Sequence, residues 1–226
     1  MIMTIYRITG LFASSYLIEK SKRLFLVDTG FLGFHRDILK TIRHIGRKPD
    51  DLELVILTHG HLDHCGGLKG LRERTNCLVG CHPLDAPGVA GGGKTVSPGL
   101  TKPGKFLEFL SDISLPFFWN RGVQPNLSLT DGASLSEFGL PAQIIHTPGH
   151  TAGHISVLLE DGRAITGDLV LGKTFFCRKP SSGSMALNTA DVRLSWLKII
   201  KSGAQRLFPA HGDAFSIDEL KKLAAL

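Results

Sequence analysis

The chain has 226 residues, of which 42% are hydrophobic and 20% are charged. This length and composition are typical of one large globular domain or two small ones, and they exclude a disordered chain. The formal net charge is +6, but the basic residues are spread along the chain in pairs such as Lys22-Arg23 and Lys221-Lys222. Because they form no dense stripe, we expect no nucleic-acid partner.

No apolar run approaches the roughly 20 residues that span a bilayer. The first residues also lack the basic region, apolar core and cleavage site of a signal peptide. We therefore expect a cytoplasmic protein without a membrane partner that acts on a small molecule, with assembly into identical copies left open.

Strand-like and helix-like segments follow one another in both halves of the chain. In the first half, apolar patterning predicts strands at residues 2–8, 15–19, 23–27, 52–57 and 77–81, and helices at 34–46 and 68–75. In the second half it predicts strands at residues 126–129, 143–146, 154–159, 164–166 and 205–208, and helices at 190–201 and 217–225. Two similar halves facing each other across one core, within a single domain of residues 1–226, fit this order best.

A segment at about 88–125 differs from the rest. Seven of the fourteen residues from 91 to 104 are glycine or proline, which predicts a long loop. A helix at 105–113 and an aromatic patch at 115–119 follow it. We interpret the whole segment as an insertion that folds over a cleft, or else as an ordinary connection whose aromatic residues pack on the core.

Residues 88–95 also match the phosphate-loop pattern GxxxxGK[ST]. That loop needs a strand before it and a helix beginning at its end. Prolines at positions 83, 87 and 98 disfavour both elements. We therefore reject a nucleotide-binding function.

The densest chemical signal is Thr-His-Gly-His-Leu-Asp-His at residues 58–64, directly after the apolar run 54–57. Histidine is the commonest metal ligand, and imidazole together with carboxylate suits zinc or iron. His59 and His61 can point the same way from an extended turn, whereas the adjacent Asp63 and His64 diverge and suit a second ion. These residues follow a predicted strand, where sites in open α/β sheets are usually built.

Three further polar residues follow predicted strands in the second half. His150 follows the strand at 143–146, Asp168 follows that at 164–166, and His211 follows that at 205–208. Glycine or proline stands beside each of them, and glycine allows the sharp turn that presents a neighbouring side chain. The repeated design points to one site built from both halves.

With these residues the chain resembles the metallo-β-lactamase superfamily. The resemblance rests on His59-Gly-His61-Leu-Asp63-His64, His150 in Thr-Pro-Gly-His, Asp168 in Gly-Asp, and His211-Gly. It implies an α+β fold, a four-layer αββα sandwich with two mixed sheets flanked by helices. It also implies that His59, His61 and His150 bind one metal, that Asp63, His64 and His211 bind a second, that Asp168 bridges the two, and that Asp28 supports the ligand loop.

The expected cofactors are two divalent metal ions, with zinc preferred over iron or manganese. In such a centre a hydroxide held between two cations attacks the scissile bond, and one cation polarises the carbonyl oxygen. Asp63 is the predicted catalytic residue, because its carboxylate can orient the hydroxide and take a proton.

The substrate is predicted from the run Thr-Pro-Gly-His-Thr-Ala-Gly-His at 147–154, which is most similar to glyoxalase II-like (hydroxyacylglutathione hydrolase-like) members. This resemblance implies hydrolysis of a thioester or other carboxylic ester. The alternatives are a phosphodiesterase or ribonuclease of the same fold, a lactonase, and a non-hydrolytic di-iron redox protein. A lactonase is disfavoured because Phe175 and Phe176 stand where such enzymes often carry a tyrosine.

Several other residues have two interpretations. Lys173, Arg178 and Lys179 either hold an anionic group of the substrate or form a solvated basic loop. His146 and His154 are interpreted as supporting or core residues rather than ligands. Asp213 either orients His211 or is exposed. The four cysteines, Cys65, Cys77, Cys81 and Cys177, are interpreted as structural.

Overall fold

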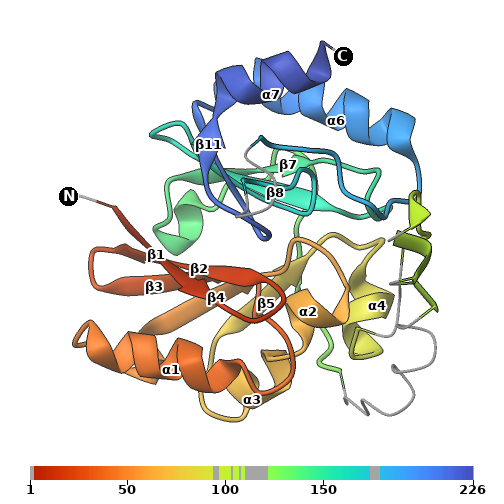
Figure 1. Ribbon diagram of the computed structural model, residues 1–226. Helices are drawn as coiled ribbons and strands as arrows, with labels where there is room; N and C mark the ends of the chain where they lie inside the picture. The colour runs from red at the N-terminus through yellow and green to blue at the C-terminus, as the bar shows by residue number, and fades with distance from the viewer. Residues whose placement is uncertain are drawn as a thin grey trace.

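The structure, a computed structural model, describes residues 3–93, 97–102, 104–106, 108–109, 122–173 and 179–225. Two β-sheets lie face to face, and helices cover the outer side of each (Figure 1). The four layers confirm the αββα arrangement expected from the sequence.

The first sheet has the strand order β1-β2-β3-β4-β5-β6. Its first three strands pair antiparallel, and the pairs from β3 to β6 are parallel. The strands are β1 (Thr4–Thr9), β2 (Ser14–Lys20), β3 (Arg23–Val27), β4 (Leu52–Ile56), β5 (Leu78–Cys81) and β6 (Leu127–Ser128).

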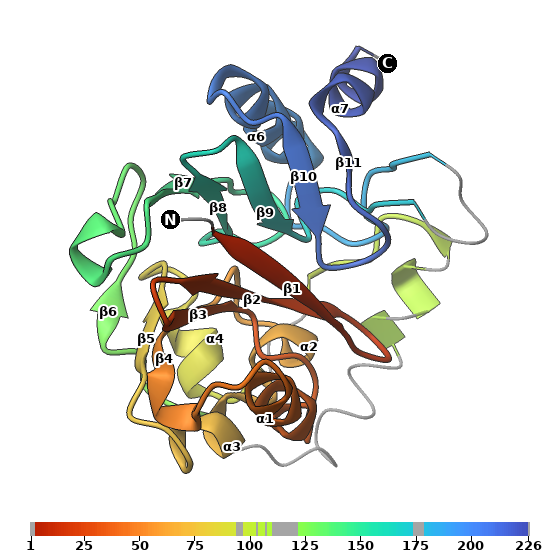
Figure 2. The same cartoon turned by 90° about the vertical axis from the view of Figure 1, so that its left-hand side faces the viewer.

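The second sheet has the order β11-β10-β9-β8-β7, and Figure 2 shows it stacked on the first. Its strands pair antiparallel except for β9 and β10, which are parallel. The strands are β7 (Ala142–His146), β8 (Ile155–Leu159), β9 (Arg163–Gly167), β10 (Arg206–Pro209) and β11 (Phe215–Ser216).

The helices divide between the two outer faces. Those of the first half are α1 (His35–His44), α2 (Leu62–Cys65), α3 (Leu68–Arg72) and α4 (Ala86–Ala90), and the second sheet is covered by α6 (Thr189–Lys201) and α7 (Ile217–Ala224). Single 3₁₀ turns lie at Pro49–Asp51 and Ser136–Phe138. Local capping defines where α6 begins, because the Asn188 side chain accepts hydrogen bonds from the first backbone N–H groups.

Successive side chains of a strand point to opposite faces of its sheet. Apolar layers therefore form on both sides of each sheet, three in all. In β3, Leu24 and Leu26 pack toward α1 and α3, whereas Phe25 and Val27 pack between the sheets. A strand that is apolar on both faces can be buried on both faces. A third apolar cluster, which includes Trp196, fills the space between the second sheet and its helices.

The strands and longer helices predicted from the sequence are present within a few residues of their expected ends. The short elements α2, α4 and β11 were not predicted, because four or five residues carry too little periodicity to be distinguished from a loop. Residues 102, 104–106 and 108–109 are helical, which agrees with part of the helix predicted at 105–113. The aromatic patch at 115–119 lies outside the described residues.

The rejected phosphate-loop pattern begins within α4 rather than after a strand, so its strand–loop–helix context is missing from the described residues. Lys94 and Thr95 lie outside the described residues.

The two sheets are tied together next to the loop that carries His211. The Tyr16 hydroxyl, on β2, donates a hydrogen bond of 2.6 Å to the carbonyl oxygen of Pro209 at the end of β10. The Ser14 N–H donates to the Ala210 carbonyl at 2.9 Å. Burial raises the pKa of Tyr16 to about 12, so the hydroxyl keeps its proton and remains a donor at all ordinary pH values.

Replacing this tyrosine tests the tie. Tyr16→Phe should lower the free energy of unfolding by about 1–3 kcal/mol, because a buried carbonyl loses its donor. Urea denaturation followed by circular dichroism measures the change. Tyr6→Phe is the control, since the Tyr6 hydroxyl bonds Glu19 near the surface and its loss should cost less. Equal losses in the two variants would contradict the proposed tie.

Candidate metal centre

Polar side chains gather at one edge of the sandwich because several strands end there. The loop after β4 carries His59 and His61, and it continues into α2, which carries Asp63 and His64. The loops after β7, β9 and β10 carry His150, Asp168 and His211. The second sheet thus supplies its three residues to a loop that belongs to the first.

The structure brings all seven predicted side chains together. Their ligand atoms form three groups in which all members lie within 4.8 Å of one another. The groups are His59, His61 and His150; His59, His64 and Asp168; and Asp63, His64 and His211. The first and third groups match the two ligand sets implied by the family resemblance, and Asp168 lies between them.

Asp28 controls the protonation of two of the histidines. Its carboxylate lies 2.8 Å from His64 Nδ1 and accepts a 2.8 Å hydrogen bond from the Thr58 hydroxyl. Because the Thr58 proton is used there, the Thr58 oxygen accepts from His59 Nδ1, 3.0 Å away. Both imidazoles therefore donate through Nδ1, and their Nε2 atoms face the centre.

Hydrogen bonds also fix which ring nitrogen of His61 and of His150 faces the centre. The Ser97 hydroxyl donates to the His150 carbonyl at 2.5 Å, so its oxygen accepts from His61 Nε2 at 3.2 Å. His150 Nδ1 donates to the Met185 carbonyl at 3.0 Å. His61 thus presents Nδ1 to the centre, and His150 presents Nε2.

Three nitrogen lone pairs consequently converge with no proton of their own between them. His61 Nδ1 lies 3.0 Å from His59 Nε2 and 3.1 Å from His150 Nε2. Burial lowers the pKa of all three histidines, and for His59 and His61 the pKa falls well below the ordinary value. Neutral imidazoles that direct lone pairs at one point repel each other unless a cation lies there, so this group fits a metal ion.

The second group is organised around Asp168. His211 Nε2 and His64 Nε2 lie 3.2 Å and 3.3 Å from Asp168 Oδ1. Both Asp168 Oδ1 and His64 Nε2 are buried, and among the described residues neither has a hydrogen-bond partner. Buried polar atoms normally have a hydrogen-bond partner. Because His64 Nε2 and Asp168 Oδ1 have none within the described part of the chain, this group also fits a cation.

Charge in this group is strongly coupled. Burial alone would raise the pKa of Asp168, but His211 and His64 hold it well below its usual range. Burial alone would lower the pKa of His64, but the carboxylates of Asp168, Asp63 and Asp28 hold it well above the ordinary value. Asp168 likewise raises the pKa of His211. Without metal, protons on these imidazoles supply the positive charge that the carboxylates require.

The sequence analysis missed Asp85, a buried carboxylate behind the centre. It accepts hydrogen bonds from the Gly60 N–H at 3.1 Å, the Thr151 hydroxyl at 2.7 Å and the Gly153 N–H at 3.1 Å. These donors belong to the two loops that carry the three converging histidines. Asp85 therefore sets how far apart the loops lie, and no local motif reveals this because its partners are distant in sequence.

His154 supports the loop that carries Asp168. Its Nε2 accepts from the Asp168 N–H at 3.2 Å, and its Nδ1 lies 2.9 Å from the Thr147 hydroxyl. Burial lowers the pKa of His154 to about 3, so the ring stays neutral. Gly167, at φ +50°, makes this packing feasible, because a Cβ there would lie 2.8 Å from His154 Nε2.

The remaining expectations have mixed outcomes. His146 stacks on His82 with ring centroids 4.2 Å apart. Lys173 forms a 2.6 Å ion pair with Glu219, and the carboxylate of the exposed Asp213 pairs with Arg7 at 2.7 Å. Cys65, Cys77 and Cys81 are free and buried, as expected for structural cysteines, whereas Cys177 and Arg178 lie outside the described residues.

Comparison with known proteins agrees with this architecture. The family model described as the metallo-beta-lactamase superfamily matches residues 8–211, a range that includes all seven candidate ligands. The chain belongs to the metallo-beta-lactamase superfamily. The coarse prediction of family and fold is therefore confirmed, and the chain is a member of a superfamily of metal-dependent hydrolases.

Several curated superfamily members are similar in sequence. A "Beta-lactamase-like protein 2 homolog" of Drosophila melanogaster is 27% identical over 205 residues, covering 88% of this chain and 58% of that protein. A "Probable metallo-hydrolase MJ0888" of Methanocaldococcus jannaschii is 27% identical over 215 residues, covering 90% of this chain and 89% of that protein. The chain thus spans little more than half the length of the first relative.

Solved structures of the superfamily share the fold. The metallo-beta-lactamase family protein TTHA1429 of Thermus thermophilus has a TM-score of 0.71 at 21% identity, covering 99% of this chain and 78% of that one. TTHA1623, crystallised in a di-iron-bound form, has a TM-score of 0.69 at 22% identity, covering 96% of this chain and 98% of that one. Within the part of the chain that the structure describes, no helix combines the length and apolarity needed to cross a membrane.

Removing the Asp85 carboxylate should weaken metal binding. Asp85→Ala is expected to lower zinc affinity about 10- to 100-fold, the usual cost of losing a group that orients metal ligands. Competition with a chromophoric chelator measures the affinity. Asp51→Ala serves as control, because the Asp51 carboxylate accepts an exposed hydrogen bond from the Lys48 N–H. If the two variants bound zinc equally well, the proposed positioning role of Asp85 would be wrong.

Metal loading should also displace protons. Because Asp168 and its neighbouring carboxylates raise the pKa of His64 and of His211, these imidazoles hold protons more tightly than ordinary histidines and must release them when a cation binds. Zinc affinity should therefore rise with pH. Isothermal titration calorimetry in buffers of different ionisation enthalpy counts the released protons. A binding enthalpy independent of the buffer would contradict this assignment.

Proposed function

We propose that the protein is a dinuclear metal-dependent hydrolase of carboxylic esters, foremost thioesters, of small molecules. The observation that carries the proposal is the pair of ligand groups on either side of Asp168, with the outer ring nitrogens of four histidines engaged in hydrogen bonds. Side chains fixed in this way present their inner nitrogens without rearrangement. The seven residues assigned as ligands, and the role of Asp63, are part of this proposal.

Two divalent cations in these positions would act as a Lewis acid toward the substrate carbonyl and would lower the pKa of a water molecule to near neutral. The donor set of five imidazoles and two carboxylates suits zinc, and iron is the alternative. TTHA1623, which has the same fold, was crystallised with two irons.

The chain's own residues divide into a buried side and an open side. The side chains of His150 and Asp168 are 6% and 12% exposed, whereas those of Asp63 and His211 are 29% and 27% exposed. Asp63 therefore lies where water and substrate arrive. Its carboxylate orients the attacking water and accepts its proton as the water oxygen bonds the carbonyl carbon. The C–S bond then breaks, and the departing thiolate takes up the proton held by Asp63.

The thioester preference rests on the run at 147–154, which is similar to glyoxalase II-like members. The basic residues beside His211 also favour a carbonyl substrate over a phosphodiester. Lys173 and Arg7, two basic residues next to the loop that carries His211, are both ion-paired. Cations already neutralised by carboxylates are poor ligands for a phosphodiester backbone.

A cytoplasmic location belongs to the same proposal. It is supported by the three described cysteines, which are free thiols, as is usual in a reducing compartment.

An activity panel on metal-loaded protein tests the function. We expect thioesters of N-acetylcysteamine to be hydrolysed with kcat/KM at least about tenfold above a homoserine lactone or bis(p-nitrophenyl) phosphate. Asp63→Asn should lower kcat about 10²- to 10⁴-fold, as for loss of a general base. Asp213→Asn, an exposed carboxylate on the same side, should have little effect. Faster cleavage of the phosphodiester, or full activity in Asp63→Asn, would overturn the proposal.

A further inference from the structure

A cavity of about 420 Å³ lies beside the metal centre. His150 and Asp168 form part of its wall, together with residues of α6, of α7 and of the segment 182–186, and with Leu100 and Leu169. The volume is within the range of small-molecule sites. Because the cavity shares two residues with the centre, a substrate whose reacting carbon lies at Asp168 can extend directly into it.

Part of the cavity wall is apolar, and the rest is polar. The apolar part includes Leu100, Leu169, Met185, Val192, Trp196 and Leu223. The one polar atom of the Trp196 ring, its N–H, donates to the Leu169 carbonyl at 2.8 Å, so the ring offers only apolar surface to a ligand. The apolar part of the wall favours a hydrocarbon chain, and each methylene that it removes from water contributes to binding.

Arg193 supplies a positive charge on the same wall. It is exposed on α6 and lines the cavity, and no hydrogen bond or ion pair engages it within the residues that the structure describes. Lys198, on the same helix, pairs with Asp131 at 2.6 Å. An unpaired guanidinium presents a planar fork of donors that matches a carboxylate.

We propose that this cavity binds the acyl part of the substrate, and that the preferred acyl chain is apolar and ends in a carboxylate held by Arg193. This inference rests on the proposed thioesterase function and adds the class of acyl group. The orientation of the bound substrate follows from how exposed the site residues are. The leaving thiol departs past Asp63 and His211 on the open side, and the acyl chain extends into the cavity behind His150 and Asp168.

The test compares three thioesters of one thiol, N-acetylcysteamine. Acetyl, hexanoyl and adipoyl groups differ in chain length and then only in the terminal carboxylate. For metal-loaded wild-type protein, kcat/KM should rise from acetyl to hexanoyl by up to about fourfold per methylene. It should rise further for adipoyl.

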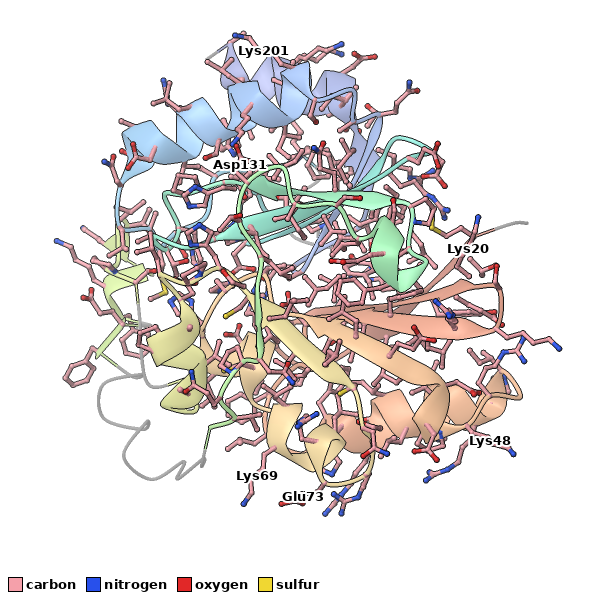
Figure 3. All side chains as sticks on the ribbon, turned by 180° about the vertical axis from the view of Figure 1, so that it is seen from behind. Lys20, Lys48, Lys69, Glu73, Asp131 and Lys201 are labelled. Carbon is pink, nitrogen blue, oxygen red and sulfur yellow. The ribbon has the colours of Figure 1, made fainter. Side chains whose placement is uncertain are left out.

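The variants isolate the charge. In Arg193→Gln the adipoyl-to-hexanoyl ratio of kcat/KM should fall about 10- to 100-fold, the usual worth of a hydrogen bond to a charged group. Lys201→Gln removes the same charge from the exposed C-terminal end of the same helix (Figure 3). Because Lys201 is not among the residues that line the cavity, this variant should leave the ratio unchanged. Rates independent of chain length, or equal ratios in the two variants, would overturn the inference but not the thioesterase function.

If no thioester is hydrolysed, the proposed function fails and binding decides the inference. In a Trp119→Phe background Trp196 is the sole tryptophan, and its fluorescence reports on ligands in the cavity. Titration with adipamate, a six-carbon carboxylate with a terminal amide, should change this fluorescence, with weaker binding in Arg193→Gln than in Lys201→Gln. No change, or equal binding in the two variants, would overturn the inference.

Discussion

The metal centre depends on the Asp28 carboxylate and on the backbone that presents it. Asp28 follows β3 with φ +61°, in the left-handed region that few residues other than glycine adopt. This strained position is held because the carboxylate bonds Thr58 and His64, and through Thr58 it orients His59. Asp28 is buried, with 2% of its surface exposed. Its position at the end of β3 thus determines how two imidazole rings are oriented.

Asp85 and Asp28 play similar parts in holding the loops of the centre. Asp28 fixes ring orientation within the first sheet's loop, and Asp85 joins that loop to the one that carries His150. Each carboxylate satisfies several buried donors, so its loss leaves those donors unpaired. The centre is therefore held by contacts between the two halves, and Tyr16 adds another at the loop that carries His211.

The αββα layering explains why reactive residues and a substrate cavity lie next to each other. Strand ends place the ligands at one edge of the sandwich, and α6 closes the outer face of the second sheet beside them. The apolar wall that includes Val192 and Trp196 is an extension of the same hydrophobic layer that binds α6 to its sheet. Packing of the helix thus creates the cavity without a separate domain.

The sequence by itself determined the strands, the layered fold and the identity of the seven clustered side chains. Continuous apolar runs mark strands buried on both faces, and dense histidine motifs at strand ends are local signals. Only the tertiary structure decided which ring nitrogens face the centre, the part played by Asp85, the pairing of Lys173 with Glu219, and the cavity beside Arg193. These depend on contacts between segments far apart in the chain, such as Asp85 with Gly153, and no local periodicity encodes such contacts.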